Sequence, residues 1–282
     1  MPNFLTSTHK KHWTFNRQQL QDLHNTKIQN FLDKASQFIP EIDKFILTPD
    51  EESKLISILT SNLLKAADHL EISNKAKATA ATYFRRFLLK HYICEYDAIN
   101  MMFTALFLAC KTEEINIRDA NNFCSHFKQS DPKRILQYEV LLISGLGFQL
   151  YVFSPDKPLS YVFSHLSSKN IPETCYTTAI DFVNLTFLTE VNLMFTPGLV
   201  AVCGFYWAVE DRIDKEDLLE EIIGLVRFSR EEFFKCYQEI KQQVLSVQQE
   251  IPEFQNLLKN LIKKSSNIRH GLKKAAHKKK HE

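Results

Sequence analysis

Residues 107–114 read Phe-Leu-Ala-Cys-Lys-Thr-Glu-Glu, so a nearly all-apolar stretch ends abruptly in a lysine and two glutamates. Upstream, apolar side chains from Ile99 to Cys110 cover more than one face at helical spacing, and Asp97 is a suitable N-cap. A helix that is apolar nearly all round is surrounded by other elements. The stretch therefore predicts a central, buried helix whose last turn carries charge.

The composition favours the same fold class. The chain has 282 residues, of which 44% are hydrophobic and 24% charged, as in a globular protein. Six glycines and nine prolines leave few tight turns, which argues against sandwiches, barrels and doubly wound sheets. We therefore expect an all-α protein. The net charge of +2 excludes a chain that binds nucleic acid through its charge as a whole.

Helix start and stop signals surround the central helix. Thr48-Pro49-Asp50-Glu51 combines an N-cap, a proline at the first helical position and a glutamate at the third. Asp131-Pro132 opens a later helix, which Gly145-Leu146-Gly147 ends. Five helices are predicted here, and a second series follows at 159–166, 174–188, 197–209, 214–225 and 229–247. The segment 176–188 has strand propensity, but its apolar spacing favours helix.

These patterns divide the chain into four parts. We predict an N-terminal arm and helix over 1–47, a first five-helix repeat over 48–151, a second over 152–248, and a C-terminal helix with a basic tail over 249–282. The N-terminal helix carries an apolar stripe from Leu20 to Ala35, which favours packing against the first repeat over a separate docking role. Trp13, ahead of that helix, is expected to mark a contact if it is exposed.

Motifs for catalysis and cofactor binding are not found in this sequence. It contains no dinucleotide fingerprint, no phosphate-binding loop and no H-E-x-x-H zinc motif. Its six cysteines stand singly, which suggests buried free thiols in a reducing compartment. We expect no catalytic residue, no metal, no cofactor and no enzyme. The longest apolar run, 101–110, is too short for a bilayer, so no membrane is expected as a partner.

A charged pair is the most informative candidate site. Lys111 ends the central helix, and Glu139 lies within the apolar run of the helix that begins at Asp131-Pro132. Such a pair suits a surface that grips a partner by charge-assisted hydrogen bonds. The alternatives are a structural ion pair between neighbouring helices or two solvated charges.

The arrangement resembles the cyclin family over about residues 48–250. The most specific matches are residues 82–87 (Thr-Tyr-Phe-Arg-Arg-Phe), 107–114, and 138–142 leading to Leu146-Gly147-Phe148. Within the family, residues 12–15 (His-Trp-Thr-Phe), Glu95-Tyr96 and 154–159 (Ser-Pro-Asp-Lys-Pro-Leu) are similar to the cyclin H group. Residues 54–59 depart from the M-R-A-I-L-type motif of cell-cycle cyclins, so substrate docking there is not expected.

The resemblance implies two tandem cyclin boxes and a regulatory role. The partner would be a cyclin-dependent kinase catalytic subunit, allosterically activated, with a RING-finger assembly subunit and TFIIH as further partners and the nucleus as location. The implied kinase-binding residues are Lys111, Glu139, Leu108, Thr112, Glu113, Phe148 and Leu150. Two other interpretations stay open: a cyclin C-like subunit of the Mediator kinase module, and a DNA-binding core domain like that of TFIIB. No sequence-specific nucleic-acid binding is expected on the first interpretation.

A basic excess marks the C-terminal residues, with candidates for nuclear import at Lys273, Lys274, Lys278, Lys279 and Lys280. A disordered solubilising tail and nonspecific attraction to nucleic acid are the alternatives.

Overall fold

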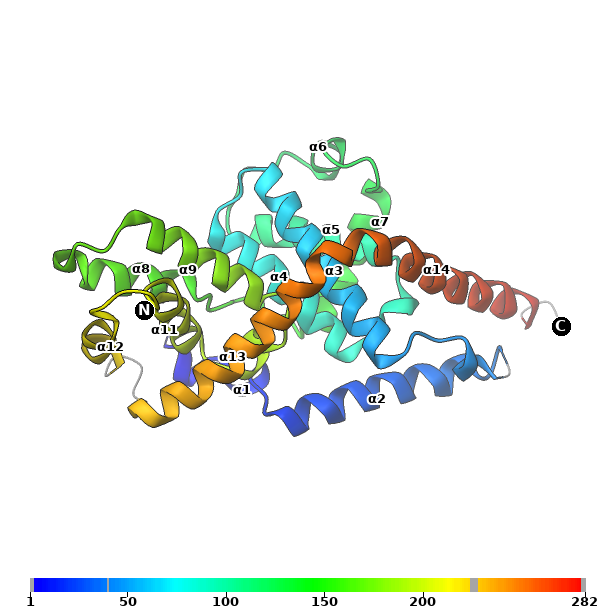
Figure 1. Ribbon diagram of the computed structural model, residues 1–282. Coiled ribbons are helices and arrows are strands. Elements are labelled where there is room, and N and C mark those ends of the chain that lie inside the picture. The colour runs from blue at the N-terminus through cyan, green and yellow to red at the C-terminus, as the bar shows by residue number, and fades with distance from the viewer. Residues whose placement is uncertain (1–2, 40, 224–227, 280–282) are drawn as a thin grey trace. The chain divides into compact units, whose positions relative to one another are not determined.

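The computed structural model describes residues 3–39, 41–223 and 228–279, and within these ranges all regular structure is helical (Figure 1). The chain forms two compact units. One combines Phe15–Leu150 with Pro252–Glu282, and the other combines Met1–Thr14 with Tyr151–Ile251. Both ends of the chain therefore fold with the repeat that is farther away in sequence.

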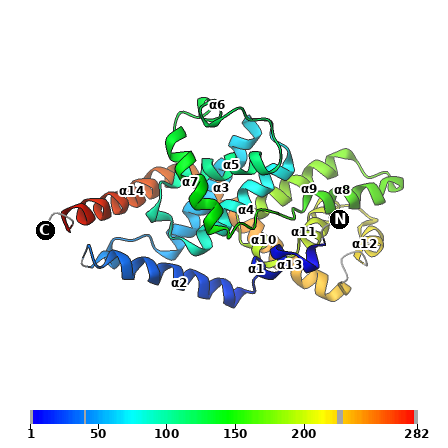
Figure 2. The ribbon, with the colours of Figure 1, turned by 180° about the vertical axis from the view of Figure 1, so that it is seen from behind.

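The first unit is built around the predicted central helix. Its repeat consists of α3 (Pro49–His69), α4 (Asn74–Lys90), α5 (Ala98–Thr112), α6 (Ala120–Ser125) and α7 (Pro132–Gly145). Helix α5 packs against α3, α4 and α7, and it is buried along almost its whole length. Figure 2 shows α7 at the near side of this unit. The prediction of a surrounded central helix is confirmed.

The helix start signals predicted from the sequence form capping hydrogen bonds in the structure. Thr48 Oγ1 accepts a hydrogen bond from the backbone N–H of Glu51 at 3.2 Å, and Glu51 Oε2 accepts one from the N–H of Thr48 at 2.8 Å. This reciprocal pair satisfies two donors that the helix leaves unpaired at its start. The side chains of Asp97 and Asp131 cap α5 and α7 by accepting the N–H of Asn100 and of Lys133, without a reciprocal bond.

Two flanking helices complete the first unit. Helix α2 (Arg17–Ala35) packs on α4, and Leu20, Phe31 and Ala35 are buried, which confirms packing against the first repeat. Helix α14 (Phe254–Lys279) packs on α3 and on the short 3₁₀ helix Ile93–Glu95.

A buried ion pair joins α2 to the repeat. Lys27 Nζ lies 2.8 Å from Glu52 Oε2 and donates to the carbonyl oxygen of Leu88 at 3.0 Å. Glu52 Oε1 accepts the N–H of Ile93 at 3.2 Å. Buried charges need this degree of pairing.

Helix α14 extends into the residues predicted as a basic tail and reaches Lys279. Its apolar stripe continues through the buried Ile268, Lys264 Nζ bonds Glu51 Oε2 at 2.6 Å, and Arg269 bonds the carbonyl of Tyr96. These contacts stabilise helix where disorder was one predicted alternative, so that alternative is wrong as far as Lys279. Lys273 and Lys274 are exposed on this helix, Lys278 and Lys279 belong to it, and Lys280 lies outside the described residues.

The second unit repeats the plan around another buried helix, α11 (Pro197–Ala208). The surrounding helices are α8 (Asp156–His165), α9 (Glu173–Thr186), α10 (Val191–Met194), α12 (Lys215–Ile223) and α13 (Arg230–Glu250). Helix α11 packs on all five. The ambiguous segment after Thr174 is helix α9, as its spacing favoured. The short α10 was not predicted, because four residues are too few to show a period.

The N-terminal residues of this unit form a small aromatic cluster. Helix α1 (Thr8–His12) places His9 so that its Nδ1 accepts the N–H of Phe153 at 3.2 Å. The rings of Phe4 and Phe153 meet edge to face, with centroids 5.5 Å apart. Trp13 is buried, so it is a core residue here and not an exposed contact.

Candidate functional site

Lys111 and Glu139 meet. Lys111 stands in the last turn of α5 and Glu139 in the middle of α7, and Lys111 Nζ lies 2.5 Å from Glu139 Oε1. The ion pair between neighbouring helices, which was an alternative to a partner contact, is therefore formed in this chain. The Lys111 side chain is 52% exposed and that of Glu139 is 12% exposed. An ammonium has three donors, so the pair leaves Lys111 able to bind a partner while α7 holds it in place.

The cation also lies over an aromatic ring. Lys111 Nζ is 5.4 Å from the ring centroid of Phe107, one turn earlier on α5. This cation–π contact and the bond to Glu139 limit the positions that the long lysine side chain can adopt. The lysine head is thus pre-positioned at the surface.

Phe148 is an exposed apolar side chain three residues after the end of α7. It is 76% exposed, and its φ is 60°, directly after Gly147, whose φ is also 60°. The N–H of Phe148 bonds the carbonyl of Ile143 at 3.1 Å, which ends α7 in two left-handed residues. A non-glycine residue held in this conformation is uncommon, and such strain gathers at functional sites.

The sequence analysis did not identify the exposed apolar side chains of α7. Leu136 and Val140 are 50% and 71% exposed and lie four residues apart, so they share one face of the helix, and Leu141 beside them is also exposed. The available signal was the apolar character of α7 all round, since Ile135 and Leu142 on its other side are buried. We call Leu136 and Val140 the α7 apolar face, and Phe148 follows the end of the same helix.

The other predicted contacts differ in accessibility. Leu108 is buried, and Thr112, Glu113 and Leu150 are half-buried. The carboxylate of Glu113 is bound within the chain: Oε1 accepts the hydroxyl of Thr79 at 2.8 Å, and Oε2 pairs with Lys75. Leu108 thus supports the surface from within, and Lys111, the half-buried Thr112 and Phe148 stand on it.

Tyr83 connects two parts of this surface. Its hydroxyl lies 3.2 Å from Thr112 Oγ1 and donates to the carbonyl oxygen of Leu150 at 2.5 Å. Burial raises the pKa of Tyr83 to about 12; the hydrogen bond with Thr112 acts against this rise, and the charge of Glu113 adds to it. The hydroxyl is therefore protonated, and able to donate, at every physiological pH.

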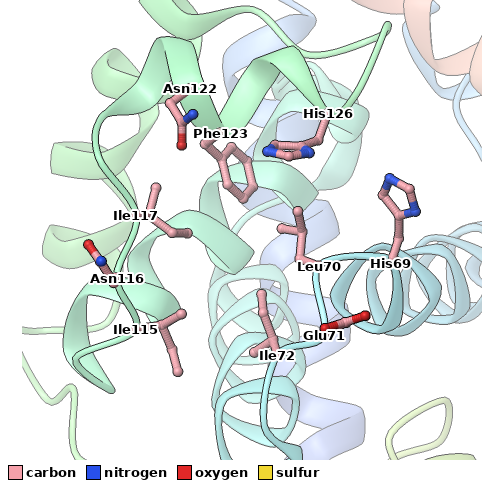
Figure 3. A pocket seen from close by; sticks show the side chains of 10 residues that line it. All are labelled: His69, Leu70, Glu71, Ile72, Ile115, Asn116, Ile117, Asn122, Phe123 and His126. Atoms are coloured by element: carbon pink, nitrogen blue, oxygen red, sulfur yellow. The ribbon is translucent and has the colours of Figure 1, made fainter.

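A separate cavity of about 340 Å³ opens in the first unit (Figure 3). It lies between the end of α3, residues 115–117 and α6, with Phe123 and Ile72 among its apolar lining and His69 and His126 among its polar lining. Across the described part of the chain, no cluster of three or more His, Cys, Asp or Glu is arranged to hold a metal ion. In the same residues, no helix combines the length and apolarity needed to cross a bilayer.

Comparison with known proteins bears on these features. Residues 26–151 match the family model of the cyclin N-terminal domain, which includes α3–α7 and the Lys111–Glu139 pair. A putative cyclin-H of Dictyostelium discoideum is 34% identical over 54% of the chain and 53% of its own length, so that match spans about half of the relative. Cyclin-H of Xenopus laevis is 28% identical over 78% of the chain and 72% of its own length.

Another similar relative is the RNA polymerase II holoenzyme cyclin-like subunit of Aspergillus oryzae, which is 28% identical over 73% of the chain and 67% of its own length. Among solved structures, a chain of the CAK complex of Chaetomium thermophilum matches with a TM-score of 0.78 and 26% identity, over 96% of this chain and 88% of that one. A chain of the yeast TFIIK complex, at 22% identity, shares the fold with a TM-score of 0.69, over 86% of this chain and all of its own length.

The structure thus has two helical repeats and a lysine–glutamate pair at the end of the central helix of the first. The similar proteins are cyclins, and several of them match most of this chain. Residues 26–151 are a cyclin N-terminal domain, and the chain has the cyclin fold.

Proposed function

We propose that this chain is a cyclin H-like regulatory subunit that binds and allosterically activates a cyclin-dependent kinase. The observation that carries the proposal is the position of the half-exposed Lys111, held by Glu139 on the helix that also carries the α7 apolar face. Exposed apolar side chains beside a fixed charge are typical of a protein-binding surface.

Each part of the surface has a distinct task in this proposal. In cyclins, the lysine and glutamate at these positions hold the partner kinase, and here Lys111 would donate to the kinase while Glu139 orients it. Phe148 would insert into an apolar pocket of the kinase, with Leu150 and Thr112 beside it, and Leu108 would support them. A buried aromatic anchor is worth about 2 kcal/mol or more. Removing one charge of a desolvated pair costs about 2–5 kcal/mol.

Activation follows from differential binding. Docking on the small lobe of the kinase would press its mobile helix inward, which completes the kinase's own Lys–Glu pair and orders its activation loop. The cyclin must bind the active state more tightly than the inactive one, since equal affinity shifts no equilibrium. On this proposal the chain itself performs no catalysis.

The relatives suggest the wider setting. The names of the similar proteins refer to cyclin-H, RNA polymerase II, CAK and TFIIK, which supports a role in a CDK-activating and polymerase-tail kinase within TFIIH, in the nucleus. A RING-finger assembly subunit is a further proposed partner. The exposed Lys273 and Lys274 remain candidates for an import signal.

A Mediator-type kinase is the second candidate partner. It is favoured by the RNA polymerase II holoenzyme cyclin-like subunits, which match over 73% of the chain. A TFIIB-like DNA-binding role has no comparable support. DNA affinity that falls steeply with salt would favour it over both kinases.

The test is co-purification with an activating-type cyclin-dependent kinase, followed by phosphorylation of a polymerase-tail peptide. Lys111→Glu should abolish both binding and activation, because it places two carboxylates together at the centre of the surface. Lys169→Glu is the matched control, since Lys169 is also a half-exposed lysine in an ion pair, with Glu221 of the other unit. A wild-type complex without any gain in kinase activity would contradict the proposal. Failure to bind this kinase, with binding to the Mediator kinase, would favour the second candidate.

A further inference from the structure

One face of α4 bonds the end of α5 at three successive turns. Lys75, Thr79 and Tyr83 lie four residues apart, so their side chains project along one side of the helix. Lys75 pairs with Glu113 Oε2, Thr79 donates to Glu113 Oε1 at 2.8 Å, and the Tyr83 hydroxyl lies 3.2 Å from Thr112 Oγ1. The two residues that follow Lys111 are thus both bound by α4.

Tyr83 also reaches the second edge of the surface. Its hydroxyl donates to the carbonyl of Leu150 at 2.5 Å, 67 residues further along the chain. Leu150 lies two residues after Phe148, beyond the point where α7 has ended in left-handed backbone. A single buried hydroxyl therefore joins the residue after Lys111 to the segment that follows Phe148.

We propose that Tyr83 is a positioning residue of the kinase-binding surface, and that it fixes the end of α5 and the segment 148–150 in the arrangement that the kinase recognises. In the same arrangement Glu113 serves as the anchor of α5 on α4, through Lys75 and Thr79, and makes no direct contact with the kinase. The proposal rests on the proposed function and deepens it, because it assigns a role to residues behind the surface.

The physical reason lies in how helix ends behave. The last carbonyl groups of a helix have no partner within it, and helix ends fray. Lys111 stands in such a last turn, and Phe148 follows another helix end. If these ends moved independently, binding would have to order them, and that ordering subtracts from affinity. The Tyr83 hydroxyl orders both ends before the kinase arrives.

The first variant is Tyr83→Phe, which removes the hydroxyl and keeps the ring. Tyr92→Phe is the matched control, since Tyr92 is also a fully buried tyrosine of the first unit whose hydroxyl donates to a backbone carbonyl, that of Leu47 at 3.0 Å. We expect Tyr83→Phe to raise the Kd for the activating-type kinase about five- to tenfold, because binding must then order both segments. Tyr92→Phe should lower the Tm about as much as Tyr83→Phe does and leave this Kd unchanged. Kinase activity at saturating cyclin should be the same for all three proteins.

Hydrogen exchange of the free chain supplies a readout that a general loss of stability does not produce. In Tyr83→Phe, the amides of residues 112–115 and 148–150 should exchange faster relative to the rest of the first unit, and in Tyr92→Phe they should not. Thr112→Val removes only the hydroxyl that lies 3.2 Å from that of Tyr83 and leaves the bond to the Leu150 carbonyl. Its effect on Kd should be smaller than that of Tyr83→Phe, and the double variant should bind like Tyr83→Phe alone.

The outcomes separate this inference from the proposed function. If the wild type binds and activates the kinase, and Tyr83→Phe has the wild-type Kd or loses no more affinity than Tyr92→Phe, the positioning role is refuted and the proposed function stands. If the wild type binds no kinase, both are refuted. A charge-preserving Glu113→Asp that lowers affinity without faster exchange at 112–115 would show that Glu113 contacts the kinase directly.

Discussion

Phe148 has a backbone conformation that a side chain other than glycine rarely adopts, and its ring lies in solvent. A φ of 60° costs such a residue about 1–3 kcal/mol, and an exposed ring recovers little of this by packing. The conformation is set by the end of α7, where Gly147 has the same φ. At the scale of the single residue, Phe148 therefore lowers the stability of the free chain and presents a ring that a partner can bury.

This residue supplies the first prediction. Phe148→Gly should leave the free energy of unfolding unchanged or raise it by up to about 1 kcal/mol, because glycine adopts a positive φ without strain. The same change should weaken kinase binding by about 2 kcal/mol, the contribution of an aromatic anchor. Chemical denaturation and a binding titration measure the two effects. A variant that is destabilised, or that binds like the wild type, would show that Phe148 serves the fold.

At the scale of the helices, Asp97 connects three of them. Its Oδ1 caps α5 by accepting the N–H of Asn100 at 3.3 Å, and its Oδ2 lies 2.5 Å from Arg134 of α7 and 3.4 Å from Arg269 of α14. Burial acts to raise the pKa of Asp97, but the hydrogen bond from Asn100 and the two arginines outweigh it, so the pKa lies below its ordinary 3.8. The carboxylate is thus more stable in the folded chain than in the unfolded one.

Asp97→Asn is the second prediction, and it has a pH dependence. Asparagine still caps a helix, so the variant should lose mainly the charged contacts, about 1.5–3 kcal/mol. A carboxyl whose pKa is lowered on folding stabilises the protein above its unfolded pKa, and that contribution is lost as the pH falls through the folded pKa. The difference in unfolding free energy between the two proteins should therefore be constant above about pH 5 and shrink at lower pH. A difference that does not change down to pH 2 would contradict this assignment.

At the scale of the whole molecule, each unit is completed by residues from a distant part of the sequence. Residues 1–14 belong with 151–251, and residues 252–282 belong with 15–150. In the first unit, α14 buries Phe254, Leu261 and Ile268 and supplies the partners of Glu51 and Asp97. Stability of the unit that carries the candidate surface therefore depends on the end of the chain.

Deletion of residues 252–282 tests this dependence. The three buried apolar side chains alone account for about 4.5–9 kcal/mol, at about 1.5–3 kcal/mol each. We expect a clear fall in the Tm of the first unit, with faster hydrogen exchange in α3 and in residues 93–95, against which α14 packs. The Tm of the second unit should not change, and it serves as the internal control. Equal losses in both units, or none, would be inconsistent with the division described above.

Much of the fold could be predicted from sequence because its signals are local. The capping box at Thr48, the proline starts of α3 and α7, and the apolar period of α5 each depend on residues within a few positions of one another. From sequence, Lys111 and Glu139 were interpreted as contacts for a partner, with a mutual ion pair as an alternative, and the structure places the two side chains 2.5 Å apart. The prediction that Gly145-Leu146-Gly147 ends this helix is confirmed, since α7 ends at Gly145, where an added Cβ would lie 2.7 Å from Phe87 of α4.

The sequence by itself determined the helices, their caps and the residues that make the candidate surface chemically suitable. Only the tertiary structure decided which distant segments meet: the buried pair of Lys27 and Glu52, the bond from Tyr83 to Leu150, and the packing of α14 on α3. The reason is physical. Helical period and capping arise from bonds that span about four residues, whereas a contact between residues dozens of positions apart leaves no periodic trace in the sequence and forms only when the helices pack.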